Sequence, residues 1–166
     1  CKNFSGVGDY WLEINFDKKN CVISGMSGAG KTTVLKGITH TLFKKSICGS
    51  PIGDLVNWNT KKGDITEVYL SKGDDEFVVR RTIKPKSSLS IEVNGEELDK
   101  KDISEMENYL LNTILEVDYK TFINLILITD KTYTPFTKMS TNQRRELIEP
   151  ILNIDYITHF RDLNKT

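Results

Sequence analysis

Residues 25–33 read GMSGAGKTT and directly follow an apolar run at positions 21–23. Their spacing satisfies GxxxxGK[ST], the pattern of a phosphate-binding loop between a strand and a helix. Close approach of a backbone to a phosphate needs residues without a Cβ atom, which this loop has at Gly25, Gly28 and Gly30. The loop amides and the positive end of the following helix would surround the anion. The stretch therefore predicts a site for a nucleotide phosphate.

Two side chains of the loop carry the predicted chemistry. Lys31 is expected to reach the β- and γ-phosphates and is the candidate catalytic residue, and the hydroxyl of Thr32 is a candidate ligand for Mg²⁺. A Ras-like GTPase would also need an NKxD motif to read guanine, and the sequence has none. We therefore predict ATP and Mg²⁺ as cofactors.

The composition limits the class of protein. The chain has 166 residues, of which 38% are hydrophobic and 28% charged, and it has no apolar run long enough to span a membrane. Lys plus Arg and Asp plus Glu both number 23, so no bulk positive charge indicates DNA or a membrane surface. Three cysteines without CxxC or metal-ligand spacing fit a reduced compartment. We predict one cytoplasmic globular unit, in the host cell if phage-encoded, with no membrane partner.

Hydrophobic periodicity predicts an α/β fold. Strands at 11–16 and 21–24 are expected to be neighbours that lead into the glycine loop, and a helix over 31–43 is expected to pack on them. The buried face of that helix is predicted to consist of Val34, Leu35, Ile38 and Leu42.

A β-rich segment follows. Alternating patterns predict an antiparallel meander with strands at 65–71, 77–83 and 89–93. The last strand runs into Asn94-Gly95, a dipeptide typical of a type I′ hairpin turn. Asp102 and Glu105 then form a capping-box pair for a helix that is expected to end near Leu115.

The last third of the chain is expected to be mostly helical. Residues 122–128 form either an apolar strand or a buried helix. Ser140 and Gln143 make a second capping-box pair, which opens a helix that Pro150 should disturb. A helical pattern over 154–163 follows, with no Gly cap, Pro or return strand to end it.

Asp130 ends the apolar run LILITD, residues 125–130. A self-contained P-loop ATPase or kinase would use such a carboxylate as its Walker B ligand for Mg²⁺. No catalytic Glu follows it, and no LSGGQ-like signature occurs in the sequence. An ABC transporter domain of this length would already show that signature. The chain therefore lacks parts of a complete ABC-type ATPase.

The residues around these motifs resemble a known family. KNFSGVGDYWLEINF at 2–16, followed by ISGMSGAGKTTVLKGITHTLF at 23–43, is similar to the amino-terminal segment of the SbcC-type branch of SMC-like ABC ATPases. YTPFTKMSTNQRRELIEPIL at 133–152 is similar to the segment that leads from the family's Q-loop into a helix with two arginines. Within the branch, the pattern is most similar to the large ATPase subunits of tailed-bacteriophage recombination exonucleases.

The resemblance implies the amino-terminal lobe of an ATPase head. Residues 1–153 would form this α/β lobe, with the P-loop at 25–32, the β layer at about 65–98, the Q-loop region at about 122–136, and a coiled-coil helix starting within 154–166. It also implies four partners: a carboxy-terminal ATPase lobe with the missing motifs, a second copy of the head, a metal-dependent nuclease subunit, and DNA. The isolated chain would then bind ATP with little or no hydrolysis.

Family positions map onto this sequence residue by residue. On the loop, the resemblance assigns nucleotide binding to Gly25, Ser27, Gly28, Ala29, Gly30, Lys31, Thr32 and Thr33. A segment near adenine and ribose is expected at Asn3, Phe4 and Ser5. Asp130 stands where most relatives have the Q-loop Gln, so it is expected at the metal together with Thr32. Ser27 replaces the family's usual Asn.

Other polar and aromatic side chains have more ordinary interpretations. Ordinary surface or packing histidines are expected at His40 and His159. A stacking platform for bases needs neighbouring aromatics in a basic groove, so a structural role is expected for Trp11 and Trp58. A basic strip, either a solvated loop or a surface facing DNA, is expected at Arg80, Arg81, Lys84 and Lys86. Either helix surface charge or a contact to the nuclease, the facing lobe or DNA is expected at Arg144 and Arg145.

Three functions are consistent with the sequence. The first is the ATP-binding lobe of a DNA-end-processing complex, which the resemblance favours. The second is a self-contained P-loop kinase or ATPase with Asp130 as its Walker B carboxylate. The third is an interaction module whose loop no longer binds nucleotide, which the intact Lys31 argues against.

Overall fold

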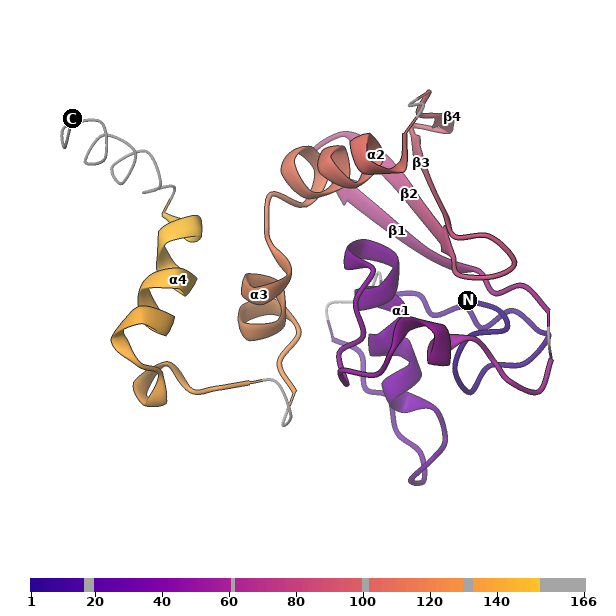
Figure 1. The fold of residues 1–166 in the computed structure, drawn as a ribbon, viewed down its shortest axis with the longest axis horizontal. Helices are drawn as coiled ribbons and strands as arrows, with labels where there is room; N and C mark the ends of the chain where they lie inside the picture. Colours follow the sequence, from indigo (N-terminus) through magenta and orange to yellow (C-terminus); the bar gives the residue numbers. More distant parts are fainter. Residues whose placement is uncertain (17–19, 61, 100–101, 130–132, 153–166) are drawn as a thin grey trace. The chain divides into compact units, whose positions relative to one another are not determined.

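The fold is described by a computed structural model that covers residues 1–16, 20–60, 62–99, 102–129 and 133–152. The chain divides into two compact units, Cys1–Ile114 and Leu115–Thr166 (Figure 1). The first unit carries the phosphate loop and a β-sheet, and the second is helical in its described part. Across the described ranges, no helix combines the length and the apolar character that crossing a membrane requires.

The sheet of the first unit is an antiparallel meander in the order β1-β2-β3-β4. Its strands are β1 (Thr66–Lys72), β2 (Asp75–Thr82), β3 (Ser88–Val93) and β4 (Glu96–Glu97). The turn between β3 and β4 has positive φ at Asn94 (52°) and at Gly95 (84°), as a type I′ turn requires. The predicted meander is therefore confirmed.

Helices α1 (Lys31–Phe43) and α2 (Ile103–Tyr109) both pack on this sheet. They cover the same face, because the side chain of Arg81 in β2 contacts the carbonyl of Thr41 in α1 and the carboxylate of Glu107 in α2. The hydrophobic core of the unit includes Phe4, Leu42, Leu55, Phe77, Val79, Leu89, Ile91 and Leu110. The predicted bounds of α1 are confirmed.

Residues 11–16 and 20–24 do not form the predicted strands. The amino-terminal segment makes two isolated bridges instead, Lys2 to Ile65 and Phe4 to Val56. A strand needs a hydrogen-bonded neighbour, and among the described residues none pairs with 20–24. The apolar run is consequently exposed, with Val22 90% accessible.

The buried face of α1 also differs from the prediction. Leu42 is buried as expected, but Val34, Leu35 and Ile38 are half-buried. The buried positions towards the meander include Thr33, Gly37, Thr39, His40 and Thr41. The helix thus has two packing faces. The more apolar face, with Val34, Leu35 and Ile38, was expected to contact the strands predicted at 11–16 and 21–24. The described residues of those segments form no strands.

Further short helices complete the first unit. The segment after α1 contains the 3-10 helix η1 (Ile52–Leu55). The N-cap of α2 is Asp102, whose carboxylate accepts a hydrogen bond from the backbone N–H of Ser104 at 3.2 Å. It continues into the π-helix η2 (Leu110–Leu115), so the predicted helical run up to Leu115 is confirmed.

The second unit contains α3 (Tyr119–Thr121), the π-helix η3 (Phe122–Ile126), the 3-10 helix η4 (Phe136–Lys138) and α4 (Thr141–Ile151). Segment 122–128 is thus helical at its start, and Leu125 and Ile126 are exposed rather than buried. The capping box is confirmed, because Gln143 N–H donates to Ser140 Oγ at 3.3 Å and Ser140 N–H donates to Gln143 Oε1 at 2.9 Å.

Pro150 was predicted to disturb the helix that opens at Ser140, but α4 extends through this residue to Ile151. Its last turn is closed by a hydrogen bond from Leu152 N–H to the carbonyl of Ile148 at 3.0 Å. A proline without an N–H costs little near a helix end, where few intrahelical bonds remain to be lost. The helix predicted over 154–163 lies outside the described residues.

Candidate nucleotide-binding site

The phosphate loop owes its shape to two glycines with left-handed backbone angles. Gly28 has φ 83° and Gly30, which precedes the first residue of α1, has φ 88°. Residues with a Cβ atom rarely adopt these angles, so the glycine spacing has a direct conformational cause. The loop closes on itself through hydrogen bonds from Ala29 N–H to the carbonyl of Met26 (3.1 Å) and from Thr33 N–H to the carbonyl of Gly30 (2.9 Å).

Lys31 folds its side chain back over the loop. Its ammonium group donates to the carbonyl oxygens of Gly25 at 2.7 Å and Met26 at 2.8 Å. These two acceptors hold the positive charge on the loop, next to the amino-terminal end of α1. A phosphate group would offer the same ammonium group a stronger, charged acceptor in that position.

The start of α1 is suited to an anion. Its first turn contains no acidic residue, so no carboxylate opposes the positive end of the helix dipole. Thr32 is exposed, and its hydroxyl is therefore accessible to a ligand, whereas Thr33 is buried. Gly25, Ser27, Gly28 and Ala29 are exposed as well, so an anion would reach the loop from an open surface.

The predicted adenine-side segment is held in the unit by hydrogen bonds. Asn3 is buried and donates its Nδ2 to the carbonyl of Gly63 at 2.9 Å, while its Oδ1 has no hydrogen-bond partner in the described part of the chain. Phe4 is 0% exposed, and its ring centroid lies 5.4 Å from that of His40. Its side chain is thus part of the core. Ser5, with φ 51°, is half-buried.

Asp130, the predicted metal-linked carboxylate, lies outside the described residues. Within the described ranges, no group of three or more His, Cys, Asp and Glu side chains could hold a metal ion. The hydroxyl of Thr32 therefore remains the candidate metal ligand that the structure describes. Mg²⁺ takes only one or two protein ligands in most phosphate sites and binds the phosphates directly, which fits this sparse donor set.

His40 is a packing histidine, as expected. It lies on α1 behind the loop, and its Nδ1 is 3.3 Å from the hydroxyl of Thr66. Burial, reinforced by the nearby charges of Arg81 and Lys44, lowers its pKa to about 4. The imidazole is therefore neutral at physiological pH and serves the packing between α1 and β1.

The predicted basic strip on the meander is divided between two faces. Arg81 is buried, where it donates from Nε to the carbonyl of Thr41 (3.0 Å) and from Nη1 to Glu107 (2.8 Å). Arg80 points to the opposite face and forms ion pairs with Glu67 (2.5 Å) and Glu92 (3.1 Å). The prediction of one solvated strip is wrong for Arg81, because strand alternation places neighbouring residues on opposite faces.

In the second unit, Arg144 is used locally. Its guanidinium donates to the carbonyls of Phe136 (3.1 Å) and Thr137 (3.2 Å), and it lies over the Phe136 ring at 5.5 Å from the centroid. Arg145 pairs with Glu149 along the helix at 3.4 Å. These contacts agree with the simpler interpretation of the pair, as charges that belong to a capped helix.

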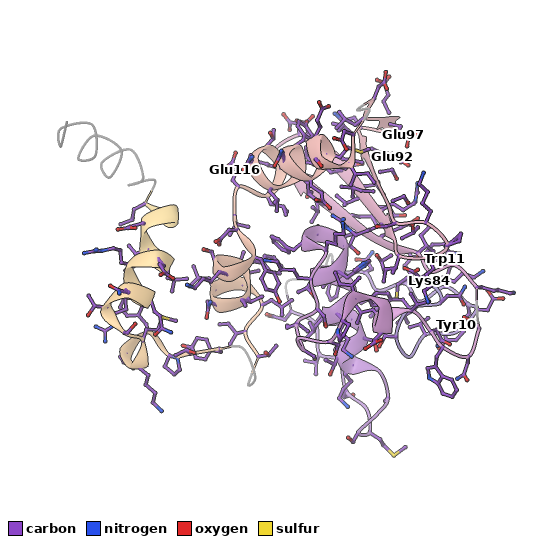
Figure 2. All side chains as sticks on the ribbon, in the orientation of Figure 1. Tyr10, Trp11, Lys84, Glu92, Glu97 and Glu116 are labelled. Atoms are coloured by element: carbon purple, nitrogen blue, oxygen red, sulfur yellow. The ribbon has the colours of Figure 1, made fainter. Side chains whose placement is uncertain are left out.

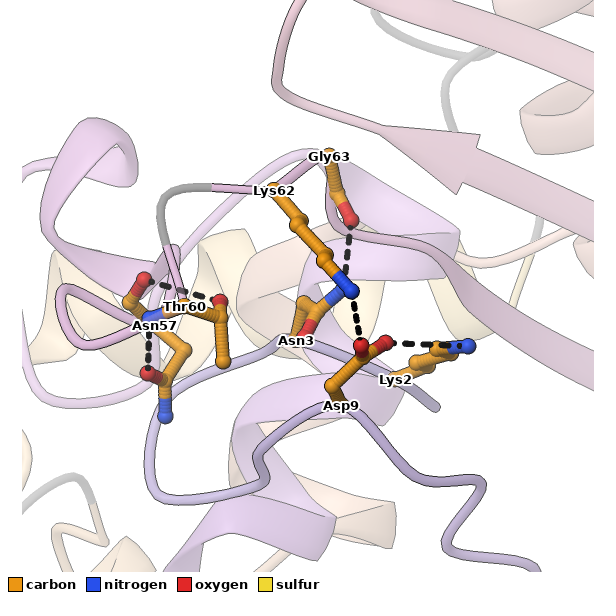
Figure 3. A network of polar contacts seen from close by, with 7 residues as sticks. All are labelled: Lys2, Asn3, Asp9, Asn57, Thr60, Lys62 and Gly63. Atoms are coloured by element: carbon orange, nitrogen blue, oxygen red, sulfur yellow. Dashed lines mark hydrogen bonds and ion pairs between the residues drawn. The ribbon is translucent and has the colours of Figure 1, made fainter.

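A polar network beside the amino-terminal segment was not predicted from the sequence (Figure 3). Its central residue is Asn57, whose Nδ2 donates to the carbonyl of Ser5 at 3.0 Å and whose N–H donates to the carbonyl of Asn3 at 2.9 Å. Asp9 forms ion pairs with both Lys2 and Lys62. The sequence from Asn57 to Thr60 is typical of a turn, which could have been predicted locally. The hydrogen bonds from Asn57 to Asn3 and Ser5 could not, because these residues are distant in sequence.

Comparison with known proteins identifies the family to which the chain belongs. A family model described as "AAA domain" (AAA_23) matches residues 1–165. Exonuclease subunit 2 of Enterobacteria phage T4 is 30% identical over 165 residues, which is 99% of this chain and 29% of that protein. Exonuclease subunit 2 of Escherichia phage RB69 is 29% identical, with the same two shares. The chain thus spans less than a third of the length of these relatives.

More distant relatives are ATPases of DNA maintenance. The DNA double-strand break repair Rad50 ATPase of Methanococcus maripaludis is 27% identical over 86% of this chain and 14% of that protein. A solved chain from work on "ATP-driven dimerization and DNA stimulated activation of SMC ATPases" is 28% identical, covers 90% of this chain and 95% of its own, and has a TM-score of 0.62. The α/β P-loop fold is thereby confirmed. The chain belongs to this AAA-domain family, and it is similar to Rad50 and SMC ATPases and to phage exonuclease subunits.

Proposed function

We propose that the chain is the ATP-binding lobe of an ATPase that couples ATP binding and hydrolysis to the processing of DNA ends. The observation that carries the proposal is the phosphate loop itself. Two left-handed glycines shape it, a first helical turn without carboxylates follows it, and the ammonium group of Lys31 lies across it. These features suit the triphosphate of a nucleotide, and the family supplies the connection to DNA repair.

The roles of individual residues follow from this arrangement. The ammonium group of Lys31 exchanges the carbonyls of Gly25 and Met26 for the β- and γ-phosphates and neutralises their charge. The hydroxyl of Thr32 ligates Mg²⁺, and Asp130 contributes a carboxylate to the same ion, through water. Asn3 and Ser5 border the adenine and ribose through their backbone. The side chain of Phe4 supports this segment from the core.

A carboxy-terminal lobe completes the site in this proposal. The chain corresponds to 29% of its phage relatives, and it has neither a signature motif nor a catalytic Glu after Asp130. Two apolar surfaces are left open near the phosphate loop, the run with Val22 and Ile23 and the half-buried face of α1. We infer that strands of the missing lobe pair with residues 21–24 and cover both surfaces.

The remaining partners are proposed from what the names and descriptions of the relatives say. The name "Exonuclease subunit 2" of the phage relatives implies a further subunit with nuclease chemistry. The solved SMC relative is described in terms of ATP-driven dimerisation and stimulation by DNA. We propose that this chain likewise works within a pair of heads that bind ATP between them, beside a metal-dependent nuclease and DNA.

Reconstitution of the head tests the proposal. We expect the chain alone to hydrolyse ATP slowly, and the chain co-expressed with its carboxy-terminal lobe to hydrolyse it at least about tenfold faster, because the missing catalytic carboxylate is then supplied. Lys31→Ala should abolish the gain, and Lys36→Ala, on the same helix, should retain it. Phosphate release from ATP is the measurement. Robust hydrolysis by the lone chain would contradict a divided site and favour the self-contained enzyme.

A further inference from the structure

A cluster of buried polar side chains lies between α1, α2 and the sheet, at the end of α1 that is remote from the phosphate loop. It contains His40, Thr41, Thr66 and Arg81, each at most 2% exposed. Arginine is rarely buried to this extent unless its charge is paired. Apolar side chains in place of a buried ion pair are often as stable or more stable, so stability alone does not explain the cluster.

The hydrogen bonds of the cluster connect the last turn of α1 to the sheet and to α2. Arg81, in β2, donates from Nε to the carbonyl of Thr41 at 3.0 Å and from Nη1 to Glu107 of α2 at 2.8 Å. The hydroxyl of Thr66, in β1, donates to the carbonyl of Arg81 at 3.2 Å and lies 3.3 Å from Nδ1 of His40. A guanidinium group holds two acceptors in one fixed plane, so Arg81 fixes the direction of α1 relative to the sheet as well as its distance.

α1 is buried mainly at this end. All five residues from Thr39 to Phe43 are buried, whereas two of the eight residues before them are. Thr41 follows Lys31 by ten residues, which at a rise of about 1.5 Å per residue is a distance of about 15 Å. At that distance, a rotation of the helix by about 4° about the Arg81 contact moves Lys31 by about 1 Å. The position of Lys31 is therefore sensitive to this contact.

The proposed nucleotide site has two parts, which are carried by different elements. The phosphate loop leads directly into α1. The adenine-side segment, residues 3–5, is tied to the residues that lead into β1. Lys2 and Ile65 exchange two backbone hydrogen bonds of 2.9 and 3.0 Å, and Asn3 donates to the carbonyl of Gly63. A nucleotide that contacts both parts therefore requires a fixed position of α1 relative to the sheet.

We propose that Arg81 is a positioning residue for nucleotide binding, which keeps the phosphate loop and the adenine-side segment at the separation that a nucleotide spans. It acts through Thr41 and Glu107, from the far end of α1. The inference rests on the proposed function, because it takes ATP as the ligand and residues 3–5 as the part that borders the base and ribose. Arg81 should then matter for ATP, which spans both parts, and not for inorganic tripolyphosphate, which needs the loop alone.

The neighbouring Arg80 provides a matched control. It points to the other face of the sheet and pairs with Glu67 and, at 3.1 Å, with Glu92, which is labelled in Figure 2. The side chains of Glu92 and Glu107 are similarly exposed, at 30% and 33%. Of the two arginines, Arg81 is the one that is hydrogen-bonded to α1. Comparing the two arginine–glutamate pairs thus isolates the contact to the helix.

Calorimetric titration of the chain with Mg-ATP and with Mg-tripolyphosphate tests the proposal. Arg81→Lys keeps the positive charge but replaces the planar fork with a single ammonium group. We expect it to raise the Kd for ATP at least about fivefold, because the loop and the adenine-side segment no longer bind ATP together, and to leave the Kd for tripolyphosphate within about twofold. Arg80→Lys should leave both values unchanged.

A second pair of variants covers the case in which Arg81→Lys does not fold. Glu107→Ala removes one of the two acceptors of Arg81 and should likewise weaken the binding of ATP and not of tripolyphosphate. Glu92→Ala, on the other face, should affect neither ligand. Urea unfolding establishes that each titrated variant is folded, so that a change in Kd does not reflect unfolded chain.

The two ligands separate positioning from stability. Equal losses for ATP and tripolyphosphate in the Arg81 and Glu107 variants would show a purely structural role and overturn the proposal, and so would an unchanged affinity for ATP. If the unchanged chain binds ATP no more tightly than tripolyphosphate, residues 3–5 contribute nothing to binding, and the inference is wrong while the phosphate site stands. If the unchanged chain binds neither ligand, the proposed function fails, and the inference fails with it.

Discussion

Arg81 links the sheet of the first unit to both of its α-helices. Its side chain is 2% exposed and joins three elements, since it comes from β2 and binds Thr41 at the end of α1 and Glu107 in α2. Burial lowers its pKa, and the hydrogen bond and charge of Glu107 oppose this effect. The guanidinium thus stays charged because its partner and the helix carbonyl replace water.

Replacing Arg81 should therefore cost much more stability than replacing its neighbour. We expect Arg81→Met to lower the free energy of unfolding by about 3 kcal/mol, because the change leaves Glu107 and the Thr41 carbonyl without their donor. Arg80→Met should cost about 1 kcal/mol, since the ion pairs of Arg80 on the other face remain partly accessible to water. Urea unfolding of both variants measures the difference, and equal losses would show that Arg81 is not a structural link.

At the scale of elements, features that depend on residues close in sequence could be predicted, whereas features that depend on a distant partner could not. The bounds of α1, the Asn94-Gly95 turn and the capping box at Ser140 follow from residues close in sequence, and all are confirmed. The strand predicted over 21–24 depends on a partner strand, which hydrophobic periodicity cannot supply. The polar network around Asn57 was missed because its hydrogen-bond partners Asn3 and Ser5 are distant in sequence.

The phosphate loop is the element whose glycines can be tested directly. Gly28 has φ 83° and no heavy atom within 4 Å of an added Cβ, so Gly28→Ala changes backbone preference without a clash. The left-handed angle costs an alanine about 1–2 kcal/mol, and we expect ATP affinity to fall by about five- to thirtyfold. Gly53→Ala is the control, because Gly53 also has open space and no positive φ. Calorimetric titration with Mg-ATP measures both, and equal affinities would contradict a conformational role for Gly28.

At the scale of the whole chain, the structure has two compact units, and the family match covers residues 1–165. The family was predictable from the order and spacing of motifs along the sequence. The positions of Asn3, Phe4 and Ser5 illustrate the limit of that inference. Their place beside adenine stays a prediction, while the structure shows what supports them, a core ring and a buried amide.

Nucleotide binding should appear as a gain in stability of the whole chain. A ligand at 100 times its Kd adds about 2.7 kcal/mol to the free energy of unfolding. We expect Mg-ATP at that level to raise the melting temperature of the unchanged chain and to leave the Lys31→Ala variant unaffected. Differential scanning fluorimetry measures both. An unchanged melting temperature in the parent chain would favour the interaction module with a loop that no longer binds nucleotide.

The contact between Arg81 and Thr41 has a mechanical consequence. α1 begins at the phosphate loop, and near its other end the carbonyl of Thr41 is hydrogen-bonded to Arg81 of the meander. A tilt imposed at Lys31 must either stretch the Arg81 bond or carry β2 and α2 along. Strain from a triphosphate bound at the loop would therefore be delivered to the opposite end of the helix, into the sheet.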